Sequence, residues 1–321
     1  MNSPIKPAEY PWPDDRPYYS YTSYLREKYG GRVQKVSIHA GFTCPNRDGS
    51  IARGGCTFCN NESFTPSYCQ PGDGITAQLD KGLAFLEKRY RRTKKFVGYF
   101  QSYTNTYGSL ETIKSYYDEA LAHPKIDGLV ISTRPDCINE EQLDYLEELA
   151  KSKIIILEFG IESCFNDTLD RVNRGHSFED AERAIKMAAG RGFHVGGHLL
   201  FGLPGDNRER LLSQADIISS LPLDSIKFHQ LQIVKGTVMA KQYRVTPEMF
   251  DLFDKEEYVE FVIDFLERLR PDICVQRFIS EAPPAIKLAP NWGNVRTDII
   301  IKEIEQRMNE RGAWQGRLYQ S

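Results

Sequence analysis

The chain has 321 residues, of which 40% are hydrophobic and 26% charged, so it can form one large domain or two ordinary ones around an ample core. A net charge of −3 excludes the globally basic surface that marks many nucleic-acid-binding proteins. No apolar run approaches the ~18 residues of a membrane span and no signal peptide opens the chain, so we expect a cytoplasmic protein with no membrane partner.

The first segment, residues 1–32, is predicted to be an irregular N-terminal arm on the surface. Several prolines stand there among aromatic residues, at Pro4, Pro7, Pro11, Pro13 and Pro17. The arm ends where the first predicted strand, Val33–His39, begins. We expect the main domain to occupy residues 33–270.

Three cysteines follow the first strand in a loop rich in Gly, Pro and Asn, with the spacing C-x11-C-x2-C: Cys44, Cys56 and Cys59. Thiolates select zinc, copper(I) or iron–sulfur clusters. A structural zinc site normally has four protein ligands, whereas a [4Fe–4S] cluster on three cysteines leaves one iron open for a substrate or cofactor. Cys69 or His39 would complete a four-ligand zinc site, and unligated buried cysteines are a further alternative.

After the cysteine loop, short apolar strands alternate with amphipathic helices. The further strands are predicted at Lys95–Ser102, Gly128–Thr133, Ile154–Gly160, Val195–Gly202 and Ile226–Val234. The helices are predicted at Ile75–Tyr90, Leu110–Ala122, Glu140–Lys151, Phe178–Gly190, Arg208–Ser219 and Glu256–Leu269. This alternation predicts a parallel sheet with crossover helices.

The fold class is therefore α/β. Six β/α units are too few for a full eight-stranded barrel, so we predict an incomplete (β/α)6 TIM-like barrel. Residues 271–321 are predicted to form a C-terminal α/β extension that packs on the barrel.

Active-site groups of such folds gather at the carboxyl ends of the strands. The second strand ends in polar residues, of which the candidates are Gln101, Ser102, Thr104 and Asn105. An ordinary polar loop with helix-capping residues is an equal alternative for this segment.

Further charged residues lie at or near later strand ends. Arg134 can clamp a carboxylate, with Asp136 orienting it. Glu158 and Glu162 share one face of an otherwise apolar strand, and buried carboxylates need partners. The segment around Gln232, in the last part of the sixth predicted strand, offers a backbone edge to a planar ring.

The cysteine loop resembles the cluster loop of radical S-adenosylmethionine (SAM) enzymes in a lengthened form. Phe58 stands before the last cysteine, where that superfamily usually has an aromatic residue beside the SAM adenine. The run Asn173–His176 is similar to one in radical SAM proteins of the coproporphyrinogen dehydrogenase and elongator catalytic subunit types. The resemblance implies a [4Fe–4S] cluster on the three cysteines, and a SAM site formed by Phe58, Gln101, Ser102, Asn105, Arg134, Glu158, Glu162, Arg174 and Gln232.

The whole chain resembles a bacterial radical SAM family related to the elongator catalytic subunit and the tRNA methylthiotransferases. It has no second cysteine triplet, because Cys137, Cys164 and Cys274 are isolated, so methylthiolation is disfavoured. The resemblance implies action on the wobble uridine in the tRNA anticodon loop, with a one-electron donor such as flavodoxin or ferredoxin. The implied reaction converts 5-carboxymethylaminomethyluridine to 5-aminomethyluridine.

RNA contacts are expected from the carboxyl-terminal region, through Arg277, Lys287, Trp292 and Arg296. Together with the basic run Lys88–Lys95, these cations are expected to form a rim around the barrel mouth. The alternative is that this region seals the open side of the barrel, with Trp292 in the core.

Two other functions remain open from the sequence. One is radical SAM chemistry on a small molecule such as a porphyrinogen. The other is a non-catalytic iron–sulfur or zinc scaffold protein.

Overall fold

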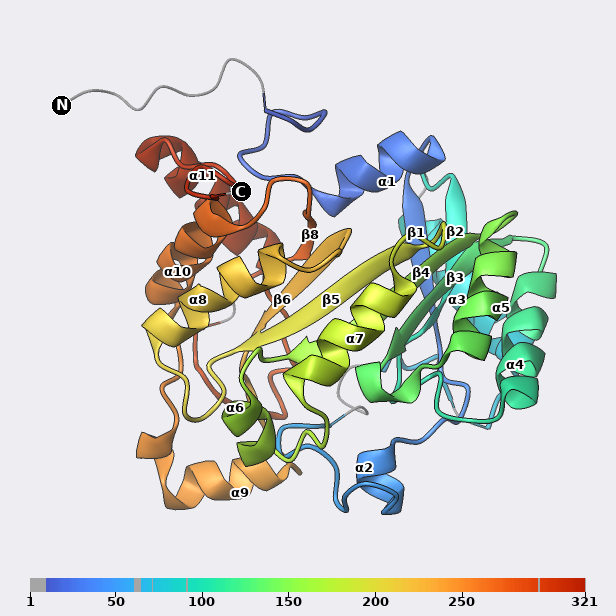
Figure 1. Ribbon diagram of the computed structural model, residues 1–321, viewed down its shortest axis with the longest axis horizontal. Helices are drawn as coiled ribbons and strands as arrows, with labels where there is room; N and C mark the ends of the chain where they lie inside the picture. The colour runs from blue at the N-terminus through green and yellow to red at the C-terminus, as the bar shows by residue number, and fades with distance from the viewer. Residues whose placement is uncertain (1–9, 61–64, 71, 91, 294, 321) are drawn as a thin grey trace.

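The computed structural model describes residues 10–60, 65–70, 72–90, 92–293 and 295–320. Seven parallel strands form one curled sheet, in the order β1-β2-β3-β4-β5-β6-β8 (Figure 1). The strands are β1 (Val33–Ile38), β2 (Lys95–Phe100), β3 (Ile126–Thr133), β4 (Ile154–Glu162), β5 (His194–Phe201), β6 (Ser225–Gln230) and β8 (Cys274–Arg277). The predicted α/β fold with an incomplete barrel is confirmed.

Helices connect successive strands and cover the outer face of the sheet (Figure 1). They are α3 (Ile75–Arg89), α4 (Leu110–Ala122), α5 (Glu140–Ala150), α6 (Asn166–Arg171), α7 (Phe178–Ala188) and α8 (Arg208–Ser219). Outward-facing strand residues such as Leu129 and Leu157 pack with helix residues such as Leu79 in one buried core. Alternate residues of the same strands face the inside of the half barrel, and these positions carry the polar groups described below.

The strand count differs from the predicted six, because the segment assigned to the extension contributes β8, which pairs in parallel with β6. This strand has only four residues, so its apolar pattern is too short to stand out in the sequence. The predicted sixth strand divides in two. After β6 ends, β7 (Ile233–Val234) pairs antiparallel with β9 (Lys287–Ala289) in a separate two-stranded sheet.

The predicted arm, residues 1–32, contains a helix, and its residues 1–9 lie outside the described residues. Helix α1 (Tyr21–Tyr29) begins after Ser20, whose side chain accepts a hydrogen bond from the backbone of the first turn. It ends at Gly30, which has a φ of 71°, a left-handed conformation that glycine adopts without strain.

Helix α1 forms the floor of the half barrel, at the end of the sheet opposite the cysteine loop and α2 (Pro45–Asp48) (Figure 1). Its Tyr21 and Leu25 pack in a small apolar cluster with residues from the strands, namely Val97, Val130, Ile154, Ile156 and Cys274. The chain just before α1 also bonds to β8, where the backbone N–H of Val275 donates to the carbonyl of Tyr19 at 2.7 Å.

The last part of the chain adds α9 (Val238–Val245), α10 (Lys255–Arg268) and α11 (Thr297–Arg311), besides the short 3-10 turns. Helix α10 packs against both α8 and α11. In the described part of the chain, no helix combines the length and the apolar character needed to cross a membrane.

Gly128 on β3 provides a test of how tightly the sheet is packed. A Cβ at this position would lie 1.9 Å from the carbonyl oxygen of Ile154 on β4, so Gly128→Ala must push these two strands apart. We expect a loss of about 1–3 kcal/mol in the free energy of unfolding, measured by urea denaturation. Gly72→Ala is the control, because a Cβ there meets no atom within 4 Å, and equal stability of the two variants would contradict this account.

Candidate active site

One cavity of about 730 Å³ occupies the inside of the half barrel, within the range of small-molecule sites. Residues from all seven strands of the large sheet line it, together with the cysteine loop. Cys44, Cys56 and Cys59 all belong to its lining. The sequence-predicted cysteine triplet and the polar strand residues therefore meet in one space.

Cys69 is held away from this triplet. Its thiol donates to the carbonyl of Ser37 at 2.9 Å, and the residue is buried. The other proposed fourth ligand, His39, accepts a hydrogen bond from the backbone N–H of Gly41 through Nδ1, at 3.1 Å. Among the described residues, no three metal-ligating side chains stand close enough to share one metal ion. A [4Fe–4S] cluster does not need such convergence, because each cysteine binds a different iron.

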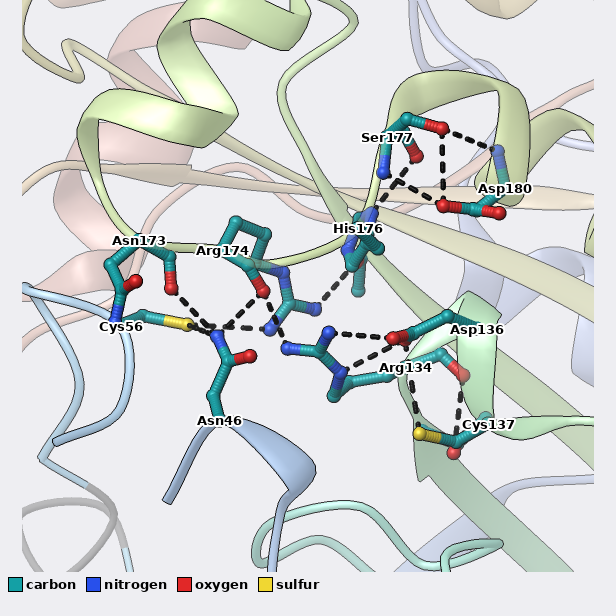
Figure 2. Close-up of polar contacts among 12 residues, drawn as sticks. Asn46, Cys56, Arg134, Asp136, Cys137, Asn173, Arg174, His176, Ser177 and Asp180 are labelled. Carbon is teal, nitrogen blue, oxygen red and sulfur yellow. Dashed lines mark hydrogen bonds and ion pairs between the residues drawn. The ribbon is translucent and has the colours of Figure 1, made fainter. Parts of the chain in front are cut away.

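Asn46, which the sequence analysis missed, ties the cysteine loop to the loop after β4. Its buried side-chain amide donates to the carbonyls of Asn173 and Arg174, both at 2.6 Å, and lies 3.6 Å from the sulfur of Cys56 (Figure 2). Arg174 also points Nη1 at the sulfur of Cys56, at 3.6 Å. Two donors therefore face one sulfur, an arrangement that stabilises negative charge on a ligating thiolate.

Arg134 lies beneath this contact and is 2% exposed. Its Nε and Nη2 donate to the two oxygens of Asp136, at 2.9 and 2.7 Å, and its Nη1 donates to the carbonyl of Arg174 at 2.6 Å (Figure 2). The expected pairing of Arg134 with Asp136 is thus present. The bond to the carbonyl of Arg174 helps to position that residue. All three nitrogens of the Arg134 guanidinium already have a protein partner, and the role of Arg134 as a carboxylate clamp stays a prediction.

The carboxylate of Glu162, at the end of β4, lies between the side chains of Arg174 and His198. Its oxygens are 3.6 Å from Nη2 of Arg174 and 3.2 Å from Nδ1 of His198. Burial would raise the pKa of Glu162, but His198 and Arg174 outweigh it and lower the pKa to about 2. The ring of His198 in turn contacts the ring of His229 edge to face, with centroids 4.3 Å apart. His229 stays neutral, since burial holds its pKa well below the ordinary value.

Glu158 lies deeper in the barrel and has a full set of partners. It pairs with Lys35 on β1 at 2.5 Å and with Lys227 on β6 at 3.0 Å. It also accepts hydrogen bonds from Gln276 at 2.7 Å, and from Tyr99 and Ser132 at 3.1 Å. Burial alone would raise its pKa, but the two lysines hold that pKa well below the ordinary value.

The predicted SAM residues on β2 and its loop lie in different surroundings. Gln101 lines the cavity and accepts from the hydroxyl of Ser37 at 3.3 Å. Asn105 is buried, and its amide donates to the carbonyls of Phe100 and Ser132, so it supports the loop. Ser102 is also buried, and neither it nor Asn105 is among the described residues that line the cavity.

Phe58 and Gln232, two of the residues predicted to contact SAM, both line the cavity. Phe58 is half-buried and packs against a small core cluster that includes Leu231. The side chain of Gln232 is engaged by the carboxyl-terminal region: its amide donates to the carbonyl of Ser280, and its oxygen accepts from the backbone of Ala282 at 2.7 Å.

The predicted basic rim is not assembled as expected. The run Lys88–Lys95, whose Arg91 lies outside the described residues, joins the end of α3 to the start of β2. It therefore lies at the amino ends of the strands, whereas the cysteine loop lies at their carboxyl ends. In a parallel sheet, the helix after one strand runs back to the edge where the next strand begins. The end of α3 and the basic run therefore lie at the edge opposite the cysteine loop, and the composition of the run alone does not indicate this.

The four predicted RNA-contacting residues have separate environments. Arg277 lines the cavity. Lys287 pairs with Glu281 at 2.7 Å, and Arg296 is exposed beside Asp298. Trp292 is half-buried against the main core and donates to the carbonyl of Phe253 at 2.8 Å, as in the alternative that placed it in the core.

Comparison with known proteins identifies the class. The model described as the radical SAM superfamily matches residues 44–216, and that of the radical SAM C-terminal domain matches residues 223–310. The chain is 35% identical over 289 residues to protein YhcC of Escherichia coli (strain K12), across 90% of this chain and 91% of YhcC. The chain therefore belongs to the radical SAM superfamily, and the match begins at Cys44.

Two more distant similarities concern the expected relation to the elongator catalytic subunit. Over 146 residues the chain is 27% identical to the tRNA uridine(34) acetyltransferase of Methanocaldococcus infernus, across 44% of this chain and only 26% of that protein. The solved structure of the archaeal Elp3 from Methanocaldococcus infernus has a TM-score of 0.62 at 18% identity, and covers 88% of this chain and 64% of its own. The expected relation to the elongator catalytic subunit is confirmed.

Membership of this superfamily implies a [4Fe–4S] cluster and SAM, and the residues present fit that cluster. Three thiols line one cavity, and the donors of Asn46 and Arg174 face the sulfur of Cys56. Residues that the sequence analysis missed, above all Asn46, Lys35 and Lys227, complete the site. Lys227 could have been found from the strand pattern, since it stands at an inward-facing position between the apolar Ile226 and Phe228, whereas Lys35 follows the polar Gln34 and gives no such signal.

Removal of single cysteines tests the ligand set. We expect Cys44→Ala, Cys56→Ala and Cys59→Ala each to lose the cluster and SAM cleavage, since three thiolates leave no spare ligand. Cys69→Ala should keep about four irons per chain, because its thiol is engaged with Ser37. Iron analysis and EPR spectra of the reconstituted proteins measure this, and loss of iron from Cys69→Ala would overturn the three-ligand assignment.

Glu158→Gln tests the buried charge network. The change leaves two buried lysines without their carboxylate, so we expect a loss of about 3–5 kcal/mol at pH 7. Because the folded-state pKa of Glu158 is depressed, its contribution is present above the unfolded pKa of about 4.3 and is lost as the pH falls below it.

The stability difference between the wild type and Glu158→Gln should therefore shrink between pH 5 and pH 3, as about 4.3 is the pKa of an unfolded Glu. Urea denaturation at several pH values measures it. Glu209→Gln is the control, since Glu209 is exposed on α8, and surface changes alter stability by about 0.5 kcal/mol or less. A difference that does not change with pH would contradict the assigned charge state.

Proposed function

We propose that the protein is a radical SAM enzyme that acts on the tRNA wobble uridine and converts 5-carboxymethylaminomethyluridine to 5-aminomethyluridine. The observation that carries the proposal is the continuity of one cavity from the cysteine triplet to a cationic interior. Similarity to a tRNA uridine(34) acetyltransferase supports a tRNA substrate. The substrate side chain has a carboxylate, which the positive charges of this cavity suit.

Each part of the cavity then has a role. Cys44, Cys56 and Cys59 hold the cluster, with Asn46 and Arg174 directed at one of the sulfurs. Phe58, Gln101 and Gln232 line the same space and are our candidates for SAM contacts, with the backbone after β6 beside the adenine. When bound, the cluster and SAM supply a 5′-deoxyadenosyl radical, with flavodoxin or ferredoxin as the proposed electron source.

The reaction balances with SAM as the two-electron oxidant. The methylene between the nitrogen and the carboxylate loses a hydrogen atom and an electron, which leaves an iminium group. Water adds to this carbon, the C–N bond breaks, and 5-aminomethyluridine and glyoxylate form. The half barrel contributes the cavity in which these steps take place.

The base must leave the stacked anticodon loop to enter the cavity. Unstacked loop bases are the usual targets of sequence-specific RNA recognition, and enzymes that react at a base take it into a pocket. Arg296, which is exposed, is our candidate for a contact with the RNA backbone outside the cavity.

Reconstituted protein incubated with SAM, a reductant and tRNA carrying 5-carboxymethylaminomethyluridine tests the proposal. We expect 5-aminomethyluridine, glyoxylate and 5′-deoxyadenosine in equal amounts, measured by mass spectrometry of digested nucleosides and by chromatography. Cys56→Ala should form none of them. SAM cleavage that is unaffected by this tRNA, with the nucleoside unchanged, would reject the proposal and favour a small-molecule substrate.

A further inference from the structure

The interior of the half barrel carries far more positive than negative charge. Among the described residues that line the cavity, the carboxylates are Glu158 and Glu162. The cations are Arg26, Arg32, Lys35, Arg47, Arg134, Arg174, Lys227 and Arg277. Four of these cations are exposed, and the other four, Lys35, Arg134, Arg174 and Lys227, are buried or half-buried. An excess of one sign in a concave site attracts a ligand of the opposite sign.

Three of these cations form a group around Glu158, on strands that are far apart in the sequence. Lys35 lies on β1, Lys227 on β6 and Arg277 at the end of β8, where it is the register partner of Lys227. Both lysines contact Glu158, and Arg277 is near enough for its charge to act on both of them. We call Lys35, Lys227 and Arg277 the interior cation group.

One carboxylate does not balance this group. Both oxygens of Glu158 are shared with Gln276, Tyr99 and Ser132 as well as with the lysines. Arg277 is exposed at the end of β8 and makes no hydrogen bond or ion pair with the described residues, whereas Arg134 and Arg174 both donate to protein partners in the same cavity. Burial lowers the pKa of Lys35 to about 8 in spite of the neighbouring Glu158, and the charges of Lys227 and Arg277 act in the same direction as burial.

We propose that Lys35, Lys227 and Arg277 bind the carboxylate of the substrate inside the half barrel, a role that rests on the proposed function and deepens it. The bound carboxylate supplies the counter-charge that the group lacks, and a guanidinium with no other partner can hold it through two parallel hydrogen bonds. Arg134, the clamp expected from the sequence, has its donors engaged by Asp136 and Arg174.

The position of the group favours a carboxylate on a base over a phosphate of the RNA backbone. Lys35 and Lys227 are 23% and 12% exposed and lie inside the sheet, deeper than a folded RNA backbone can follow, while Arg277 is exposed at the carboxyl end of β8. A splayed nucleoside side chain can reach this depth. A substrate held there by its carboxylate extends along the same cavity toward the cysteine triplet.

Two synthetic anticodon stem–loops test the proposal, one carrying 5-carboxymethylaminomethyluridine and the other its neutral primary amide. We expect the wild type to bind the acid at least tenfold more tightly than the amide, measured as Kd by fluorescence anisotropy in the presence of SAM. In Arg277→Gln the preference should fall to about twofold or less, and Arg277→Lys should restore part of it. Lys227→Met should act in the same direction.

Arg183→Gln is the matched control, because Arg183 is exposed on the outer face of α7 and pairs only with Asp180 among the described residues. It should keep the full preference. The melting temperature and the iron content verify that Arg277→Gln remains folded and loaded with the cluster. An acid-to-amide preference that Arg277→Gln leaves intact overturns the site, as does an equal loss of affinity for both RNAs, which would indicate a phosphate contact.

Failure of the proposed function gives a different result. In that case the wild type converts neither RNA and shows no preference between them. The interior cation group is then judged with N-methylglycine alone, titrated into the SAM-loaded wild type and Arg277→Gln by calorimetry. Binding that is lost in Arg277→Gln supports a carboxylate site for another substrate, and equal heats in the two proteins overturn it.

Discussion

One buried carboxylate, that of Glu158, links strands of the open sheet that share no backbone hydrogen bonds. Glu158 on β4 receives side chains from five other strands, through Lys35, Tyr99, Ser132, Lys227 and Gln276. Lys35 belongs to the first strand of the sheet and Gln276 to the last, and the described strands form no backbone ladder between them. The contacts of Glu158 therefore link the two edges of a half barrel, where a closed barrel would use main-chain hydrogen bonds.

The contacts of Glu158 tie the strands together below the cysteine loop. Once the strands are linked through Glu158, a few side-chain hydrogen bonds are enough to position the loops at the carboxyl ends of the strands. The amide of Asn46 supplies them by joining the cysteine loop to the carbonyls of Asn173 and Arg174. Arg134 holds the same carbonyl of Arg174 from the other side. Buried bonds of this kind are costly to leave unsatisfied, so the loop geometry is strongly specified.

Much of the fold was predictable from the sequence, because its signals are local. The cysteine spacing, the alternation of strands and helices, and the pairing of Arg134 with Asp136 two residues away all lie within short windows. The seventh strand was missed because four residues carry too little pattern. Lys35 and Lys227 were missed for a different reason: they lie in separate strands, and only the curvature of the sheet brings them to one carboxylate.

The contact between β8 and the chain before α1 has a consequence for association with other molecules. An unclosed sheet ends in strands whose outer N–H and C=O groups can recruit a strand from another chain. In this protein the bond from Val275 to Tyr19 and the bridge from Val275 to Ser20 occupy part of that border on β8. The segment that leads into α1 thus covers part of the free edge of β8. Removal of this segment would expose that edge to pairing with a strand from another molecule, which is a route to aggregation.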